Sequence, residues 1–200
     1  MRSRMRYWWV NQNQTYLHEI AGGYLWSPKR NANKARNPFY ESMREVAPGD
    51  IIFSFRDTRI AALGIARSYC YESPKPTEFG TAGSYWEAIG WKIDVSFREL
   101  DNRIHPKSHI GELRGLLPEK YSPLRANGDG LQSVYLAEVG QPDCCKRRRS
   151  NTFLIGGSSG SITRRSDRLA CGGSLVIETF IRWRMTRAEL CAMPRVHAEG

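Results

Sequence analysis

Tryptophans in polar loops are the residues of this 200-residue chain with the most specific chemical potential. Trp26 lies in the polar, basic stretch Tyr24–Arg36, and Trp86 follows the loop residues Gly83–Tyr85. Core packing is the expected role of a tryptophan inside a predicted strand, such as Trp91. Two loop tryptophans could instead sandwich a planar base, which is worth about 1–3 kcal/mol of stacking per base. Trp26 and Trp86 therefore predict an aromatic cage.

Polar side chains near these tryptophans could read the edge of such a base. Asn11, Asn13 and Asn31 offer amide donors and acceptors, and Ser27 offers a hydroxyl. The alternative role of all four is turn and cap chemistry, which suits asparagine and serine in loops. The sequence leaves both roles open.

Four cations follow the loop tryptophan directly, namely Lys29, Arg30, Lys34 and Arg36. They would suit phosphates that flank a base held by Trp26, or they could form a solvated basic loop. The formal net charge of +10 also favours a polyanionic partner. However, residues 1–139 contain 19 Lys and Arg against 15 Asp and Glu, whereas 140–200 contain 11 against 5. More than half of the excess charge therefore lies outside the main domain.

The sequence contains no complete motif for catalysis or for metal binding. The four histidines are scattered, and His105 and His109 have helical spacing but no third ligand nearby. Gly156–Gly160 is not followed by the Lys-Ser/Thr of a phosphate-binding loop. We therefore predict no catalytic residue, no metal and no cofactor in this chain. The sequence has no apolar run long enough for a membrane span or a secretory signal. We therefore expect a cytoplasmic protein with reduced cysteines.

The patterning predicts an α+β fold in which strands outnumber short helices. Strands are expected at 6–12, 51–55, 59–71, 91–97 and 131–139, and helices at 15–20, 38–46 and 106–117. The stretch 24–36 is expected to be a loop, and Gly64 to mark a bulge or a close approach. Short strands with helices at their ends suit a small mixed barrel.

The amino-acid composition of the chain changes after Val139. A basic run at Lys146–Arg149 and a glycine-serine stretch at Gly156–Ser161 follow. We expect 140–200 to be a poorly ordered tail, or a truncated or out-of-frame remnant, because little apolar patterning is left to offset the entropy of ordering. The predicted domain is thus 6–139.

Several phrases in a fixed order resemble a known family. Tyr7–Asn11, Trp26–Arg36, Pro48–Phe53 and Ile60–Ala66 follow the order of the EVE branch of the PUA-like superfamily, to which YTH readers of methylated adenine look distantly related. The phrases YWWVNQNQTY, GGYLWSPKR, PGDIIFSF and GLQSVYLAEV look closer to one subgroup. These are the amino-terminal reader domains of modification-dependent restriction endonucleases that carry an HNH nuclease.

The resemblance implies a PUA-like mixed β-barrel with short flanking helices. It implies that Trp26 is the first cage wall, that Trp86 or Trp91 is the second, and that Asn11 and Ser27 line the pocket. The expected ligand is a methylated or hydroxymethylated cytosine in DNA, flipped out of the duplex at a cost of a few kcal/mol.

The nuclease part of that subgroup has no counterpart in this chain. Beyond residue 140 there is one histidine, His197, and one asparagine, Asn151, so the His-Asn-His set of an HNH domain is missing. We therefore expect the chain alone not to cut DNA. Two other functions stay open: an RNA-modification binding module, and a nuclease completed by a partner chain. The sequence does not fix the oligomeric state.

Overall fold

Residues 5–131 and 133–140 of the chain are described in a computed structural model. The predicted tail lies outside these residues, apart from Gly140. The strands are β1 (Tyr7–Asn11), β2 (Tyr24–Pro28), β3 (Ile51–Arg56), β4 (Arg59–Ala66), β5 (Tyr71–Pro74), β6 (Ile89–Ile104) and β7 (Leu136–Val139). The helices are α1 (Tyr16–Gly22), α2 (Pro38–Glu41) and α3 (Ile110–Leu113), with single 3₁₀ turns at Ser42–Glu45, Thr77–Phe79 and Pro106–His109.

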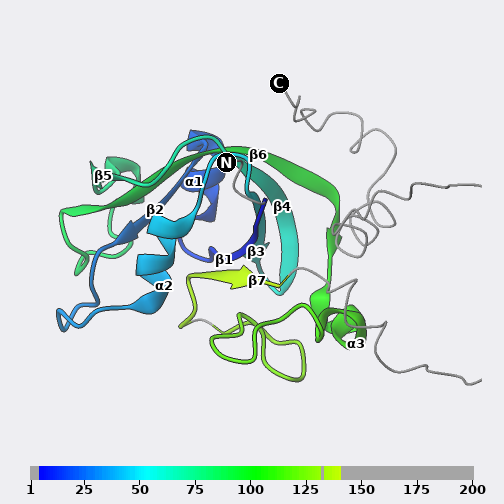
Figure 1. Cartoon of the computed structure of the whole chain (residues 1–200). Coiled ribbons are helices and arrows are strands. Elements are labelled where there is room, and N and C mark those ends of the chain that lie inside the picture. Colours follow the sequence, from blue (N-terminus) through cyan, green and yellow to red (C-terminus); the bar gives the residue numbers. More distant parts are fainter. Residues whose placement is uncertain (1–4, 132, 141–200) are drawn as a thin grey trace, which may run out of the picture.

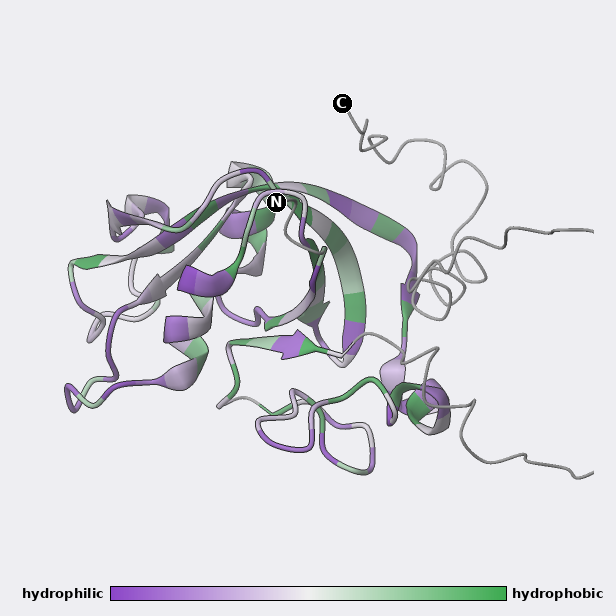
Figure 2. Ribbon diagram, in the orientation of Figure 1, coloured by the Kyte–Doolittle hydropathy of each residue, from purple (hydrophilic) through white to green (hydrophobic). Residues whose placement is uncertain are grey.

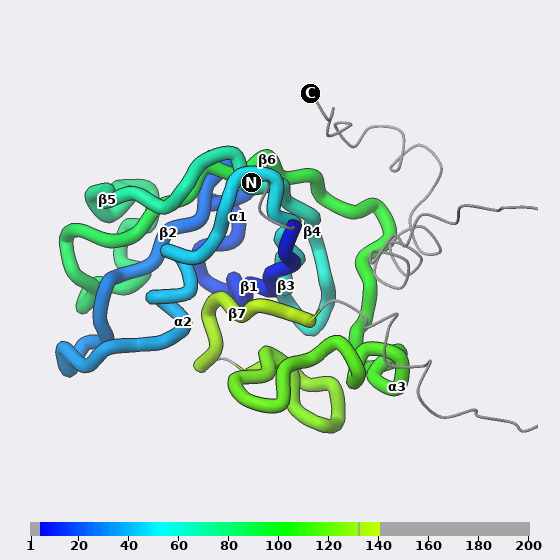
Figure 3. The backbone as a smooth tube through the Cα atoms, in the orientation of Figure 1, coloured from blue at the N-terminus to red at the C-terminus, as the bar shows by residue number. Residues whose placement is uncertain are grey.

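The described strands form one mixed sheet in the order β2-β6-β4-β3-β1-β7, and β5 pairs with β6 beside that path. β1 runs parallel to β3, and the other pairs are antiparallel. The sheet curls into a half-barrel with the short helices at its ends (Figure 1). β7 comes last along the described chain, yet it lies beside β1 (Figure 3). The predicted α+β class, with a mixed curled sheet and short flanking helices, is confirmed.

Both faces of the central strands are buried. Along β1, Tyr7 and Trp9 enter one apolar cluster, whereas Trp8 and Val10 enter another. Alternation along a strand sends neighbouring side chains to opposite faces, so a continuous apolar run indicates burial on both. The Asp50 carboxylate ties the start of β3 to this strand by accepting from Trp8 Nε1 at 2.8 Å and from the Arg6 backbone N–H at 3.0 Å.

Gly64 confirms the predicted close approach. A Cβ built on this residue would lie 2.6 Å from Val95 Cγ1 and 2.7 Å from Phe97 Cε1. Any larger residue there would force the Val95 or Phe97 side chain to move, because real Cβ atoms do not come so close to neighbouring carbons.

Two strand predictions differ from the structure. The stretch 24–36 was expected to be a loop, but its first five residues form β2, which pairs with β6 from Tyr24–Asp94 to Pro28–Gly90. Conversely, the long strand expected at 59–71 ends at Ala66 as β4, and a separate strand, β5, begins at Tyr71. The Ser68 hydroxyl accepts from the Asp94 backbone N–H at 2.9 Å, so a side chain replaces a ladder bond where the strand breaks.

The bounds of four other elements also differ. β6 is 16 residues long instead of the seven expected. Its second half is mostly hydrophilic (Figure 2), and it continues to pair with β4 as far as Ile60–Ile104. The expected strand 131–139 is shortened to β7, and the expected helices 38–46 and 106–117 each consist of a four-residue α-helix joined to a 3₁₀ turn. Hydrophobic periodicity indicates that a strand or helix exists more reliably than where that element ends.

Candidate functional site

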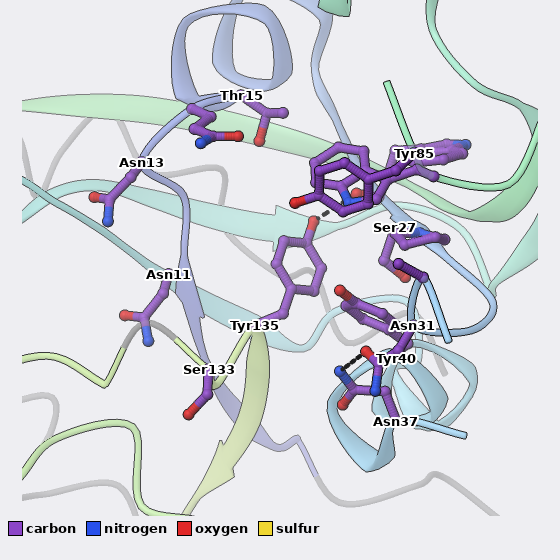
Figure 4. A pocket seen from close by; sticks show the side chains of 15 residues that line it. Asn11, Asn13, Thr15, Ser27, Asn31, Asn37, Tyr40, Tyr85, Ser133 and Tyr135 are labelled. Atoms are coloured by element: carbon purple, nitrogen blue, oxygen red, sulfur yellow. Dashed lines mark hydrogen bonds between the residues drawn. The ribbon is translucent and has the colours of Figure 1, made fainter. Parts of the chain in front are cut away.

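A cavity of about 590 Å³ opens at the seam of the half-barrel, where the sheet's two terminal strands, β2 and β7, face each other without pairing. Its walls come from β2, from α2 and the loop before it, from the loop before β6, from the end of β1 and the residues after it, and from the residues before β7. The lining residues are Asn11, Asn13, Gln14, Thr15, Trp26, Ser27, Pro28, Asn31, Ala32, Asn37, Tyr40, Tyr85, Trp86, Ser133 and Tyr135 (Figure 4).

Trp26 forms a fixed wall of this cavity. It lies on β2 and is only 1% exposed, and its indole N–H donates to the Ser73 carbonyl at 3.2 Å. Its ring contacts Phe79 edge-on, with 5.9 Å between centroids. The residue therefore serves the core as well as the cavity, unlike the loop position that the sequence predicted.

Trp86 packs directly on Trp26. The ring centroids are 6.0 Å apart and the planes are inclined by 34°. A base inserted between two rings needs near-parallel planes and two stacking distances, or roughly 7 Å, since carbons pack at about 3.5 Å. In this geometry the tryptophans form one continuous wall, and the predicted sandwich would require Trp86 to move.

Three tyrosines complete the aromatic lining, and the sequence reasoning missed all of them. Tyr40 and Tyr135 meet edge-on at 6.1 Å between centroids, and Tyr85 stands beside Trp86 at 6.2 Å. Tyr85 is 68% exposed at the mouth of the cavity. Because Tyr85 is next to Trp86 in the sequence, it could have been predicted as a cavity residue. Tyr40 and Tyr135 carry no local signal, because distant segments bring them together.

Ser27 supplies a buried hydroxyl without a partner. The residue is 1% exposed, and its Oγ has no hydrogen-bond partner within the described part of the chain. A buried polar atom left unpaired costs about 1–3 kcal/mol. A group that enters the cavity and bonds to Ser27 would recover part of that cost.

Asn31 and Asn37 form a short amide network at the edge of the cavity. Asn37 Nδ2 donates to Asn31 Oδ1 at 2.9 Å, and Asn37 Oδ1 caps α2 by accepting from the Phe39 backbone N–H at 2.9 Å. The side-chain amide nitrogen of Asn31, Nδ2, makes no hydrogen bond to a described residue, so it is available to a ligand.

Asn11 lines the cavity but is committed to the fold. Its amide nitrogen donates to the carbonyls of Leu131 and Val134 at 2.9 and 2.7 Å, and its oxygen accepts from Trp9 Nε1 at 2.9 Å. These bonds leave Asn11 no amide hydrogen for a base. It holds the segment before β7 against β1.

Trp91 does not line the cavity. It lies on β6 and packs against the apolar cluster around Met43. Lys29 Nζ lies 4.6 Å from its ring centroid, and the Arg44 guanidinium carbon lies 5.3 Å from it. Of the two second walls that the resemblance implied, the structure brings only Trp86 to Trp26.

The four predicted phosphate ligands divide into two kinds. Lys29 is paired with Glu72, at 2.5 Å between Nζ and Oε1, and covers Trp91. Arg30, Lys34 and Arg36 are exposed and make no ion pair with a described residue. They lie on a tight hairpin closed by the Arg30–Arg36 bridge and by Asn31 N–H to Ala35 O at 3.0 Å. This hairpin borders the cavity through Asn31 and Ala32.

A buried carboxylate holds the cavity wall together. Glu19 on α1 is 0% exposed, and its oxygens accept from four groups. The donors are Gln12 Nε2 at 2.6 Å, Thr15 Oγ1 at 2.7 Å, the Trp26 backbone N–H at 2.8 Å and Tyr135 Oη at 2.9 Å. Glu19 therefore bridges the seam that strand pairing leaves open.

Burial raises the pKa of Glu19, while its hydrogen-bond donors oppose that shift. Tyr135 Oη explains how a protonated Glu19 would be satisfied, because this oxygen also lies 2.9 Å from the Trp26 carbonyl. A protonated Glu19 can donate to Tyr135, which then donates its single hydrogen to Trp26. Burial likewise raises the pKa of the Tyr40 and Tyr135 hydroxyls, which keeps both neutral.

Other kinds of site find little support in the described residues. No group of three or more His, Cys, Asp or Glu side chains there could hold a metal ion. No helix within 5–131 and 133–140 is long and apolar enough to cross a membrane.

No protein-family model matches the chain, and no curated protein matches it. Solved structures do show similarity. A hypothetical protein from Leishmania major is 14% identical over 68% of this chain and 88% of its own, with a TM-score of 0.46. A Pseudomonas syringae protein is 15% identical over 66% and 90%, with a TM-score of 0.41. The Pho92 YTH domain in complex with m6A is 17% identical over 61% and 71%, with a TM-score of 0.37. At these values the similarity carries no argument about function.

Proposed function

We propose that this chain binds a modified nucleobase in DNA, most simply a methylated or hydroxymethylated cytosine, in the seam cavity. The observation that carries the proposal is Ser27, a cavity-lining residue whose buried hydroxyl has no hydrogen-bond partner among the described residues. Trp86 and the tyrosines supply faces for stacking, and the Asn31 amide supplies a donor. A neutral base suits this lining, because no lining residue is charged at neutral pH.

The exposed hairpin supports a polyanionic backbone beside the cavity. Arg30, Lys34 and Arg36 are free of ion pairs to described acids and lie next to cavity residues Asn31 and Ala32. Phosphate contacts by such cations fix register and supply affinity without reading sequence. A flipped base would enter the cavity while its phosphates stay at this rim.

The resemblance of the sequence to EVE readers of HNH endonucleases adds a biological setting to the proposal. In that setting this chain is the reader, and cleavage belongs to a nuclease that the chain does not contain. Incubation of modified DNA with the chain and Mg²⁺ should leave the DNA intact. Specific cleavage would contradict this part of the proposal.

Binding to matched oligonucleotides tests the function itself. Fluorescence anisotropy should be measured on one duplex sequence with a single plain, 5-methylated or 5-hydroxymethylated cytosine, and on RNA of the same sequence. We expect the modified DNA to bind about tenfold tighter than plain DNA, or about 1.4 kcal/mol. Stronger selectivity on modified RNA would transfer the function to the RNA alternative, and equal affinity for all would contradict it.

Two tryptophan variants locate the binding. Trp86→Ala should abolish the preference for modified DNA, because it removes a cavity wall. Trp91→Ala is the matched control, because Trp91 is also half-buried but lies outside the cavity. Loss of selectivity in Trp91→Ala alone would place the site elsewhere.

A further inference from the structure

The seam cavity is larger than a single base requires. Pockets of about 300–1,000 Å³ hold drug-sized ligands, which have many more atoms than a cytosine. The cavity of about 590 Å³ lies well inside that range. A base with a small methyl group would leave much of this volume to water.

The lining also offers more hydrogen-bonding groups than the pairing edge of cytosine has polar positions. Several side chains have groups with no hydrogen-bond partner among residues 5–131 and 133–140. They are the amides of Asn13 and Gln14, the Asn31 amide nitrogen, and the hydroxyls of Ser27, Tyr40 and Tyr85. These groups are spread over the loop after β1, β2, the hairpin, α2 and the loop before β6, so no single flat base edge reaches all of them.

The chemical character of these groups restricts the ligand. All of the lining side chains are neutral, and the free cations stay outside on the hairpin. A charged substituent would lose its hydration without gaining a countercharge, which is costly. Hydroxyl groups, in contrast, can both donate to and accept from amides and phenols. The aromatic rings of Tyr40, Tyr85 and Trp86 offer apolar faces to the C–H groups of a ring.

We propose that the cavity takes a base that carries an uncharged, polyhydroxylated substituent, such as a hexose on 5-hydroxymethylcytosine, in preference to a methylated base. This inference rests on the proposed function and names its substrate class. The base would lie against the tryptophan wall and Ser27. The substituent would fill the remaining volume toward Asn13 and Gln14, with Tyr85 covering it at the mouth.

Four modified duplexes and a plain one test the proposal. The same sequence would carry cytosine, 5-methylcytosine, 5-hydroxymethylcytosine, glucosylated 5-hydroxymethylcytosine or 5-carboxylcytosine at one position, and affinity would be measured by anisotropy at constant salt. We expect the glucosylated duplex to bind about tenfold tighter than the methylated one. The carboxylated duplex should bind no tighter than plain DNA.

The outcomes separate this inference from the proposed function. Equal or tighter binding of the methylated duplex, relative to the glucosylated one, would overturn the inference and leave the reader function standing. No difference between any modified duplex and plain DNA would remove both.

Tyr85→Ala provides a second test, with Tyr69→Ala as the matched control. The two tyrosines are 68% and 69% exposed, but only Tyr85 lines the cavity. Tyr85→Ala should weaken binding of the glucosylated duplex about fivefold more than binding of the methylated duplex, whereas Tyr69→Ala should change neither. An equal loss on both duplexes in Tyr85→Ala would overturn the assignment of the substituent to this end of the cavity.

Discussion

The two ends of the half-barrel, a closed apolar end and the seam between β2 and β7, are built differently. At one end, side chains from β1, β3, β4 and α3 close an apolar core around Trp9, Phe53 and Leu116, leaving a cavity of about 30 Å³ lined only by apolar residues. At the seam, a cavity of about 590 Å³ is lined largely by amides, hydroxyls and aromatic rings. Apolar packing closes the first end, whereas the buried Glu19 carboxylate takes the place of strand pairing at the second. The contrast separates residues that stabilise the sheet from residues that are free to bind.

The largest expected effect is at Trp26, which belongs to both groups. Trp26→Ala should lower the free energy of unfolding by about 3–5 kcal/mol, because it removes a buried indole. Urea denaturation measures this loss. The sequence predicted a loop position for Trp26, whereas its burial in β2 makes a loss of stability the expected result. Trp86→Ala, at the half-exposed side of the same wall, should cost less than half as much. Equal costs would contradict the division of roles.

Features of the fold and of the site were predictable where the pattern that indicates them lies in residues that are neighbours in the sequence. β1, β3 and Gly64 were predictable because apolar runs and alternation are local. β2 was missed because three apolar residues precede a basic stretch, and its strand character comes from pairing with β6. Four of the predicted pocket residues, Trp26, Ser27, Asn31 and Trp86, come together with free or stacking groups, and Asn11 joins them with its amide hydrogens already used. Tyr135 was not predictable, because its place opposite Trp26 depends on long-range folding.

Leu116→Ala at the closed end is the next largest effect. It should destabilise the chain by about 2–4 kcal/mol, since Leu116 is buried in the apolar cluster. Affinity for modified DNA should not change below the unfolding temperature. Thermal unfolding and anisotropy on the same preparation measure the two quantities. A loss of selectivity in this variant would show that the two ends are coupled.

Glu19→Gln tests the seam and its pH dependence. The amide places an NH₂ among hydrogen-bond donors, so unfolding should become easier by about 1–3 kcal/mol. Because burial raises the folded-state pKa of Glu19, its contribution to stability is fully present below the unfolded-state pKa of about 4.5 and declines as the pH rises through the folded-state value. The stability difference between wild type and Glu19→Gln should therefore shrink from about pH 4 to pH 8.

Comparison with the variant cancels groups that titrate in both proteins, such as Glu78, whose pKa is lowered by its bond from Tyr24. Denaturation curves at several pH values give the required difference. A gap that widens with rising pH would show that the donors around Glu19 outweigh its burial.

Ser27→Ala should change binding without harming the fold. Its hydroxyl is buried without a described partner, so the substitution should be neutral or slightly stabilising. Affinity for modified DNA should fall roughly two- to tenfold, the worth of one hydrogen bond. Opposite signs for stability and affinity would mark Ser27 as a binding residue. A drop in stability with unchanged affinity would contradict that role.

The smallest expected effects concern the exposed hairpin beside the cavity. Three phosphate contacts from Arg30, Lys34 and Arg36 predict a slope of roughly −2.7 for log affinity against log salt in duplex DNA. Replacing Arg30 and Lys34 by Ala should flatten it by about 1.8. Lys29→Ala is the control, because the Lys29 ammonium is already paired with Glu72, and it should change the slope little. A larger change in Lys29→Ala would reverse the assignment.

The most direct test of the seam as the binding site is a single ¹⁵N NMR titration of the indole N–H groups with modified duplex DNA. Trp→Phe variants assign the signals. The indoles of Trp26 and Trp86 should shift, because both rings form the cavity wall. The indole of Trp8 should not, since it donates to Asp50, which does not line the cavity. Shifts confined to Trp8, Trp9 or Trp91, with Trp26 and Trp86 unchanged, would contradict the account.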